Sequence, residues 1–193
     1  MQPIEQLERN LKASIEAKQM LLKDTGQLNT FDKAVQCVIR AYRAGGRLYV
    51  AGNGGSAADA QHIATEFVSK LARPRAPLPA EALTVDTSTL TAIGNDYGFD
   101  EVFARQIEGK MSQRDVFLAI TTSGQSRNIL RALETCRNLG IQSILLTGND
   151  GGKAKPLANI CLIAPGRDTS GIQEVHMVLY HSLVGAVESA LCP

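Results

Sequence analysis

The sequence predicts an α/β protein with a doubly wound, five-stranded parallel sheet, flavodoxin-like or Rossmann-like, preceded by an N-terminal helical extension. Short apolar runs rich in β-branched residues recur along the chain, at residues 47–52, 81–86, 115–122, 143–148 and 160–165. Segments with helical periodicity separate these runs, and strands that alternate with helices form a parallel sheet covered on both faces. The length of 193 residues suits one domain with a sizeable core.

The first part of the chain, residues 1–46, is expected to form helices that precede the sheet. Apolar residues recur near one helical turn apart at Ile4, Leu7, Leu11, Ile15 and Leu22. We expect Thr25-Gly26 to end this helix, and a second helix to run from a Thr30 cap to Gly45-Gly46. The first helix has little core of its own. We therefore expect these helices to be used in oligomer packing, with packing on their own domain as the alternative.

The α/β sandwich is expected to span residues 47–193, within a single domain that covers residues 1–193. Its helices are predicted at about residues 57–71, 100–111, 126–139 and 171–190. No linker or low-complexity segment interrupts the pattern, so no second domain is expected.

The composition argues against nucleic acid and membranes as partners. The net charge is +1 and no basic block stands out, whereas nucleic-acid-binding proteins concentrate basic residues on one face. We expect Lys70, Arg73 and Arg75 to form a solvated loop edge. The N-terminus is polar, and no apolar run is long enough to cross a bilayer. The four cysteines lack CxxC spacing, which favours free thiols and a cytoplasmic protein.

Two turns rich in glycine and serine lie where parallel sheets bind ligands, outside the carboxyl ends of the strands. In VAGNGGSAA, the glycines at 52, 54 and 55 would let backbone N–H groups approach a ligand, and Ser56 is expected to cap the next helix. In AITTSGQSR, hydroxyl groups at a helix start predict a phosphate site made of Thr121, Thr122, Ser123 and Ser126. Either turn alone could be an ordinary connection, but two on one sheet edge favour a ligand site.

The first turn also matches the G-x-G-x-x-A pattern of dinucleotide-binding folds. That fingerprint needs an acidic residue about 20 positions further on, at the end of the second strand. The nearest strand-ending acid is Asp86, well beyond that spacing. Five strands also fall short of two mononucleotide-binding halves, so we rank a dinucleotide site behind a site for a small anionic substrate.

His62 and Glu66 follow the glycine turn and lie one helical turn apart, so both project from one helix face. His176 and His181 lie about 140° apart on the last predicted helix and cannot easily serve one site. For each histidine, burial in the core is the common alternative. Nitrogen and oxygen ligands without thiolate suit a divalent ion such as zinc, and the candidate set is His62, Glu66, Gln173 and His181. Helical geometry alone does not choose between the two C-terminal histidines.

Five motifs are similar to those of one family: AGNGGSAADAQHIATEF, LTAIGNDYGF, ITTSGQSRNI, LTGNDGG and IQEVHMVLYH. By these motifs the chain resembles the bacterial phosphoheptose isomerases (sedoheptulose 7-phosphate isomerases) of the sugar-isomerase (SIS) domain superfamily. The resemblance implies aldose–ketose isomerisation of sedoheptulose 7-phosphate, a phosphorylated seven-carbon sugar, to D-glycero-D-manno-heptose 7-phosphate. This is the first step of nucleotide-activated heptose biosynthesis, which serves lipopolysaccharide among other glycans. The resemblance also implies a cytoplasmic homotetramer with one Zn²⁺ per subunit.

The resemblance also implies residue roles. Glu66 and His181 match the catalytic acid/base pair. The metal ligands match His62, Glu66, Gln173 and His181. The sugar and phosphate contacts match Asn53, Gly54, Gly55, Asn95, Asp96, Thr121, Thr122, Ser123, Ser126 and Gln173. One position departs from the pattern, because some members place an aspartate where this chain has Ser170, with Asp168 two positions earlier.

Two other functions remain open at this stage. Some relatives are non-catalytic tetrameric scaffolds that bind a replication initiator protein, and their site is degraded at the glycine turn and the carboxylate. This chain keeps Gly54-Gly55 and Glu66, which ranks the scaffold second. The other alternative is a different sugar-phosphate isomerase of the same superfamily.

Overall fold

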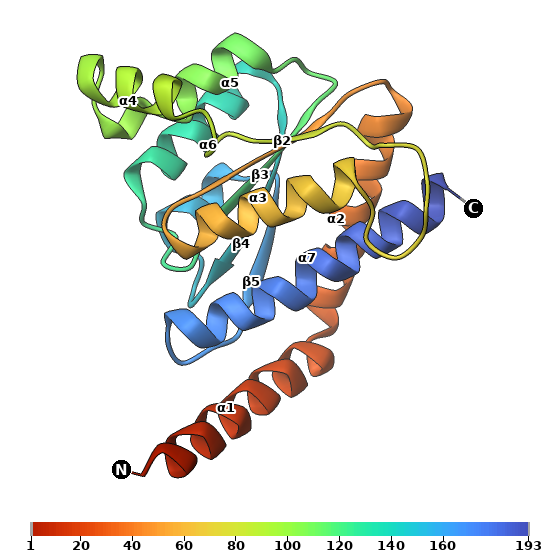
Figure 1. The fold of residues 1–193 in the computed structure, drawn as a ribbon, viewed down its shortest axis with the longest axis vertical. Coiled ribbons are helices and arrows are strands. Elements are labelled where there is room, and N and C mark those ends of the chain that lie inside the picture. Colours follow the sequence, from red (N-terminus) through yellow and green to blue (C-terminus); the bar gives the residue numbers. More distant parts are fainter. Residues whose placement is uncertain (1, 193) are drawn as a thin grey trace.

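A computed structural model describes residues 2–192 as a parallel sheet with helices on both faces (Figure 1). Within these residues the sheet has five strands in the order β2-β1-β3-β4-β5, and every pair is parallel. The strands are β1 (Leu48–Gly52), β2 (Ala80–Ala82), β3 (Val116–Thr121), β4 (Gln142–Gly148) and β5 (Ile160–Ala164). This order is flavodoxin-like, with the winding direction reversing between β1 and β3. The predicted fold class is confirmed.

Each face of the sheet buries its own half of the strand side chains, because neighbouring residues of a strand point to opposite sides. On β3, Leu118 belongs to one core cluster and Phe117 to the other. The first face is covered by α2 (Thr25–Arg43), α3 (Gly55–Val68) and α7 (Thr169–Leu191). The second face is covered by α4 (Thr87–Asp96), α5 (Ala104–Lys110), α6 (Arg127–Leu139) and η2 (Gly152–Leu157), and η1 (Phe99–Glu101) lies between α4 and α5 in the chain.

The second predicted strand, 81–86, is wrong in extent. β2 is a short edge strand with β1 as its partner, and the chain turns at Leu83. Asp86 caps α4 instead of ending a strand, because its carboxylate accepts a hydrogen bond from Thr89 N at 3.0 Å. Helix α4 was not predicted, and the predicted helix 100–111 is divided into η1 and α5.

The break between the first two helices also differs from the prediction. α1 (Pro3–Lys23) ends just before Asp24, whose carboxylate accepts a hydrogen bond from Gln27 N (2.9 Å) and thereby caps α2. A carboxylate is a strong cap because it satisfies a free N–H group of the first turn. Thr30 therefore lies inside α2, where its hydroxyl donates to the carbonyl oxygen of Gly26 (2.8 Å).

Helix α1 extends away from the body of the molecule (Figure 1). Its apolar residues are more than half exposed: Ile4 (71%), Leu7 (58%), Leu11 (53%), Ile15 (56%) and Leu22 (72%). In the described part of α1, Ala17 and Leu21 are the buried residues. The expectation that this helix has little core of its own is confirmed. No helix within residues 2–192 is both long enough and apolar enough to span a membrane.

Candidate functional site

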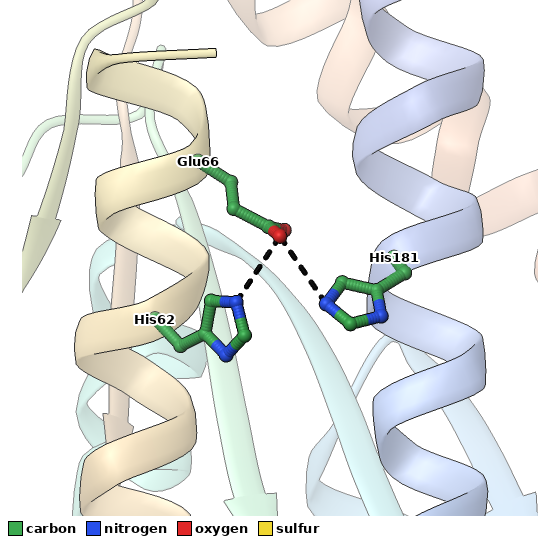
Figure 2. A group of neighbouring side chains, drawn as sticks. All are labelled: His62, Glu66 and His181. Atoms are coloured by element: carbon green, nitrogen blue, oxygen red, sulfur yellow. Dashed lines mark hydrogen bonds and ion pairs between the residues drawn. The ribbon is translucent and has the colours of Figure 1, made fainter. Parts of the chain in front are cut away.

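Helices α3 and α7 bring three predicted ligands together (Figure 2). Glu66 Oε1 lies 3.1 Å from His62 Nε2 and 3.2 Å from His181 Nε2. His62 and Glu66 share one face of α3, as their spacing predicted, and His181 faces them from α7. The carboxylate of Glu66 therefore stands between two imidazole rings.

The three side chains differ in exposure. The Glu66 side chain is 9% exposed, whereas those of His62 and His181 are 45% and 36% exposed. Glu66 Oε2 is buried and accepts no hydrogen bond from residues 2–192. A buried carboxylate oxygen without a partner costs free energy, so the arrangement favours a cation or a proton at this position.

The donor set fits a divalent metal ion. One ligand atom from each of His62, Glu66 and His181 lies within 4.8 Å of the others. In a tetrahedral zinc site, metal–ligand distances of about 2.0–2.2 Å place neighbouring ligand atoms about 3.3–3.6 Å apart. The contacts of 3.1 and 3.2 Å are close to that spacing.

The structure resolves which C-terminal histidine belongs to the cluster. His176 is fully buried on α7, and its Nε2 donates to the carbonyl oxygen of Thr147 on β4 at 3.0 Å. Burial lowers the pKa of His176, and the Thr147 carbonyl offsets part of that effect. His181, five residues further along, points to α3. His176 is thus a core residue.

The glycine turn packs against α7 through Gln173. α3 begins at Gly55, and Gly54 is its N-cap with φ of 56°, a left-handed conformation that glycine adopts freely. A Cβ on Gly55 would collide with Gln173 Nε2, so a larger residue would displace the end of the Gln173 side chain. Ser56 is buried in the first turn of α3 and does not cap it, which corrects the prediction.

A pair of amides joins the two predicted ligand turns. Asn53 Nδ2 donates to Asn128 Oδ1 (2.8 Å), and Asn128 Nδ2 donates to Asn53 Oδ1 (2.9 Å). Asn128 is buried in the first turn of α6, and the sequence analysis did not single it out. The only signal was its position at the end of TTSGQSRN. This pair fixes the glycine turn beside the hydroxyl-rich turn.

The hydroxyl-rich turn leads into α6 as predicted. Thr121 Oγ1 and Ser126 Oγ lie 3.1 Å apart, and Ser126 is the N-cap without using its side chain as the cap. Ser123 is exposed, and its Oγ accepts a hydrogen bond from Gln125 N at 3.2 Å. Thr122 is half-buried. Hydroxyls and free N–H groups at one helix N-terminus are suited to an anion.

The predicted sugar contacts Asn95 and Asp96 lie apart from the cluster. Both are exposed at the end of α4, where Asn95 Nδ2 donates to Asp96 Oδ1 at 2.8 Å. Asp96 lines a surface hollow together with Arg105 and Lys110. No hydrogen bond or ion pair within residues 2–192 joins either residue to the histidine cluster.

Arg75 contradicts the expectation of a solvated loop edge, whereas Lys70 and Arg73 are exposed as expected. The side chain of Arg75 is 3% exposed, and its Nε pairs with Glu188 Oε2 of α7 at 3.2 Å. Its Nη1 and Nη2 donate to the carbonyl oxygens of Phe67 and Glu66, each at 2.8 Å. A guanidinium at the last carbonyls of α3 satisfies groups that have no partner inside the helix.

Glu188, on α7, also binds the backbone of the loop that follows α3. Its carboxylate accepts hydrogen bonds from Leu71 N (3.2 Å) and Arg73 N (2.9 Å). Burial alone would raise the pKa of Glu188, but these N–H groups and the Arg75 guanidinium hold it below its usual value. This pair could not be predicted from local patterns, because its partners lie far apart in the chain.

Asp168 acts as a helix cap. Its carboxylate accepts hydrogen bonds from Gly171 N (2.8 Å) and the Ser170 hydroxyl (3.0 Å) at the start of α7. The Gly171 N–H, followed by the Ser170 hydroxyl, lowers the pKa of Asp168. Within the described chain, Asp168 therefore serves as the N-cap of α7, and Ser170 donates a hydrogen bond to it.

The fold and the match of a family model described as the SIS domain, over residues 12–148, define a SIS-domain protein. The chain is also 44% identical over 185 residues to the phosphoheptose isomerase of Aneurinibacillus thermoaerophilus, which covers 96% of this chain and 93% of that protein. The chain belongs to the phosphoheptose isomerase family.

Solved structures give the same assignment. A phosphoheptose isomerase from Neisseria gonorrhoeae matches with a TM-score of 0.91 and 37% identity, over 97% of this chain and 100% of that one. One from Francisella tularensis matches with a TM-score of 0.92 and 34% identity, over 98% and 100%. The resemblance stated from the motifs is confirmed.

Proposed function

We propose that the protein is an aldose–ketose isomerase that converts sedoheptulose 7-phosphate to D-glycero-D-manno-heptose 7-phosphate, the first step of nucleotide-activated heptose biosynthesis. The observation that carries this proposal is the Glu66 carboxylate between the His62 and His181 imidazoles, on the helix that follows an intact glycine turn. The scaffold alternative is not favoured, because it requires neither the carboxylate nor the turn. Membership of the phosphoheptose isomerase family supports the choice of substrate.

Each ligand turn takes one part of the substrate in this proposal. The phosphate binds at the start of α6, where the hydroxyls and N–H groups converge. The sugar binds at the glycine turn. Its proposed contacts are Asn53, Gly54, Gly55, Asn95, Asp96 and Gln173. The assignment of Asn95 and Asp96 rests on their motif, and that of Gln173 also on its contact with Gly55.

Glu66 and His181 carry the proton transfers. Moving a carbonyl between C1 and C2 requires removal of a carbon-bound proton, its return to the neighbouring carbon, and passage through an enediol. Glu66 takes and returns the carbon-bound proton, and its Oε2 is free of hydrogen-bond partners within the described chain. His181 moves the proton of the sugar oxygen, a role suited to an imidazole near neutral pH.

We further propose that His62, Glu66, Gln173 and His181 hold one divalent ion, with Zn²⁺ as the expected metal. When bound, the ion acts as a Lewis acid that polarises the sugar oxygens. The spacing of the two imidazoles around Glu66 supports three of these ligands, and the assignment of Gln173 rests on its motif. Protein prepared without chelator should contain about one divalent ion per chain. Full activity of a metal-free preparation would contradict the metal centre.

The assembly and compartment are also part of the proposal. We infer a homotetramer from the resemblance to the family, and the exposed apolar face of α1, which needs a partner surface, supports an oligomer. We place the enzyme in the cytoplasm, because Cys37, Cys136, Cys161 and Cys192 are all free thiols.

Incubation of the purified protein with sedoheptulose 7-phosphate tests the proposed reaction. The aldose product should accumulate and should be detected by chromatography or NMR. Five- and six-carbon ketose phosphates, offered in parallel, separate this reaction from that of another sugar-phosphate isomerase. Turnover of only a shorter sugar would contradict the substrate, and no turnover of any would favour the scaffold.

A further inference from the structure

Tyr180 has no assigned role, yet its hydroxyl lies next to His62, on the side of the ring that faces away from Glu66. The residue is fully buried on α7, and its hydroxyl donates to Asp59 Oδ1 of α3 at 3.3 Å. The same oxygen lies 3.5 Å from His62 Nδ1. The Tyr180 ring packs edge-on against His62, with ring centroids 5.6 Å apart, and against His181, with centroids 4.8 Å apart.

The chemistry of Asp59 and Tyr180 determines which atom donates in each of these hydrogen bonds. The Asp59 carboxylate only accepts hydrogen bonds, and a tyrosine hydroxyl has one proton to donate. Because that proton points to Asp59, Tyr180 presents a lone pair to His62 Nδ1. A lone pair favours the tautomer in which Nδ1 carries the proton. His62 Nε2 then keeps its lone pair on the side that faces Glu66.

The Nε2–H tautomer of His62 would occupy the nitrogen that the metal ion needs. Without a partner at Nδ1, His62 can carry its proton on Nε2 and donate it to Glu66 Oε1, only 3.1 Å away. That hydrogen bond must break before a cation can bind. In metal sites the second ring nitrogen of a ligand histidine is usually fixed by an outer hydrogen-bond partner, which sets the tautomer.

We propose that Tyr180 and Asp59 are positioning residues that hold His62 in its Nδ1–H tautomer and so prepare Nε2 for a divalent cation. This inference rests on the proposed metal centre. Asp59 lies one helical turn before His62, and Tyr180 directly precedes His181, so α3 and α7 each supply an outer residue next to a histidine ligand. The buried Asp59 Oδ2 makes no hydrogen bond within residues 2–192, so Tyr180 is the main contact of this carboxylate.

The Tyr180→Phe variant tests the proposal, because it removes the hydroxyl and keeps the ring. Its affinity for Zn²⁺, measured by competition with a chromogenic chelator, should be about 10–100-fold weaker than that of the wild type. Tyr49→Phe is the matched control: Tyr49 is 4% exposed, and its hydroxyl donates to the Lys110 carbonyl oxygen at 3.3 Å, away from the cluster. Its zinc affinity should be unchanged.

Histidine tautomers give a second readout, without metal or activity. The three histidines allow site-specific assignment by long-range ¹⁵N–¹H NMR of the metal-free protein. The fraction of His62 that carries its proton on Nδ1 should be larger in the wild type than in Tyr180→Phe, in which the Glu66 carboxylate draws the proton to Nε2. His176, which donates from Nε2, serves as the internal reference. Asp59→Ala, which removes the acceptor of the Tyr180 proton, should shift His62 in the same way and covers the case in which Tyr180→Phe fails to fold.

If folded Tyr180→Phe kept both the His62 tautomer and the zinc affinity of the wild type, Tyr180 would not be a positioning residue for His62. A wild type that binds no divalent ion would contradict the metal centre of the proposed function. The tautomer measurement would then still decide whether Tyr180 and Asp59 orient His62.

Discussion

His176 makes the stability of the fold depend on pH through a single residue. Its pKa is lowered by burial, so the folded state keeps it neutral, whereas the unfolded chain takes up a proton near pH 6.5. A histidine with a lowered folded pKa contributes stability above its unfolded pKa, and this contribution is lost as the pH falls below about 6.5. The loss should be about 1.4 kcal/mol per pH unit until His176 is itself protonated.

Urea denaturation at pH 7.5 and pH 5.5 measures this effect. His176→Gln keeps a hydrogen-bonding group but does not titrate, so its free energy of unfolding should fall less between the two pH values. Equal losses in the variant and the wild type would show that other groups dominate.

The proposed anion site contains two serine hydroxyls. Ser123 and Ser126 lie at an accessible turn, and each hydrogen bond to a charged group contributes about 1.5–3 kcal/mol. The Ser123→Ala/Ser126→Ala double variant should therefore bind sedoheptulose 7-phosphate at least tenfold more weakly in calorimetry and should remain folded. Ser170→Ala, at the start of α7, is the control. Wild-type affinity in the double variant would remove this turn from the site.

The parts of the site that rest on local spacing could be predicted from the sequence. His62 and Glu66 share a helix face because they are one turn apart, and the hydroxyls of the second turn are contiguous. Helical geometry could not choose His181 over His176, because the choice depends on which side of α7 packs on the sheet, and His181 was assigned only by the family motif. Arg75 was expected in solvent because its partner, Glu188, comes near only in the folded chain.

Helices α3 and α7 must keep a fixed position relative to one another, because each supplies ligands to the cluster. The Arg75–Glu188 pair joins them behind the site, and both side chains are almost fully buried. Removing one partner of a buried pair leaves an uncompensated charge and costs about 3–5 kcal/mol. Arg75→Met and Glu188→Gln should each lower the free energy of unfolding by about that amount.

A double-mutant cycle distinguishes pairing from general packing. The combined Arg75→Met/Glu188→Gln variant should be less destabilised than the sum of the single variants, because it buries no unpaired charge. Additive losses in urea denaturation would show that the two residues do not act as a pair.

Element types were easier to predict than element ends. The four strands with long apolar runs, β1, β3, β4 and β5, occur close to where periodicity placed them. β2 is shorter because it is an edge strand that the capped helix α4 follows closely. The start of α2 was misplaced because Asp24, rather than Thr30, satisfies the free N–H groups of the first turn.

For the whole molecule, the exposed face of α1 implies an assembly. Charged substitutions at Leu7 and Leu11 would place charge in an apolar interface, so Leu7→Glu/Leu11→Lys should shift the sedimentation velocity profile from tetramer to smaller species. Lys12→Glu is the control, since the Lys12 side chain is 80% exposed. A tetramer that survives the double substitution would place the interface elsewhere, and a monomeric wild type would contradict the assembly.

Turnover by Glu66→Gln tests whether Glu66 is the base of the proposed isomerase. The variant keeps the size and hydrogen bonding of the side chain but loses the base, which should lower kcat by about 10²–10⁴-fold. Calorimetry should still detect binding of sedoheptulose 7-phosphate. His181→Gln should behave alike, and the double variant should be little worse than either, because the pair acts as a unit. A folded Glu66→Gln protein that isomerises sedoheptulose 7-phosphate at the wild-type rate would show that Glu66 is not the base.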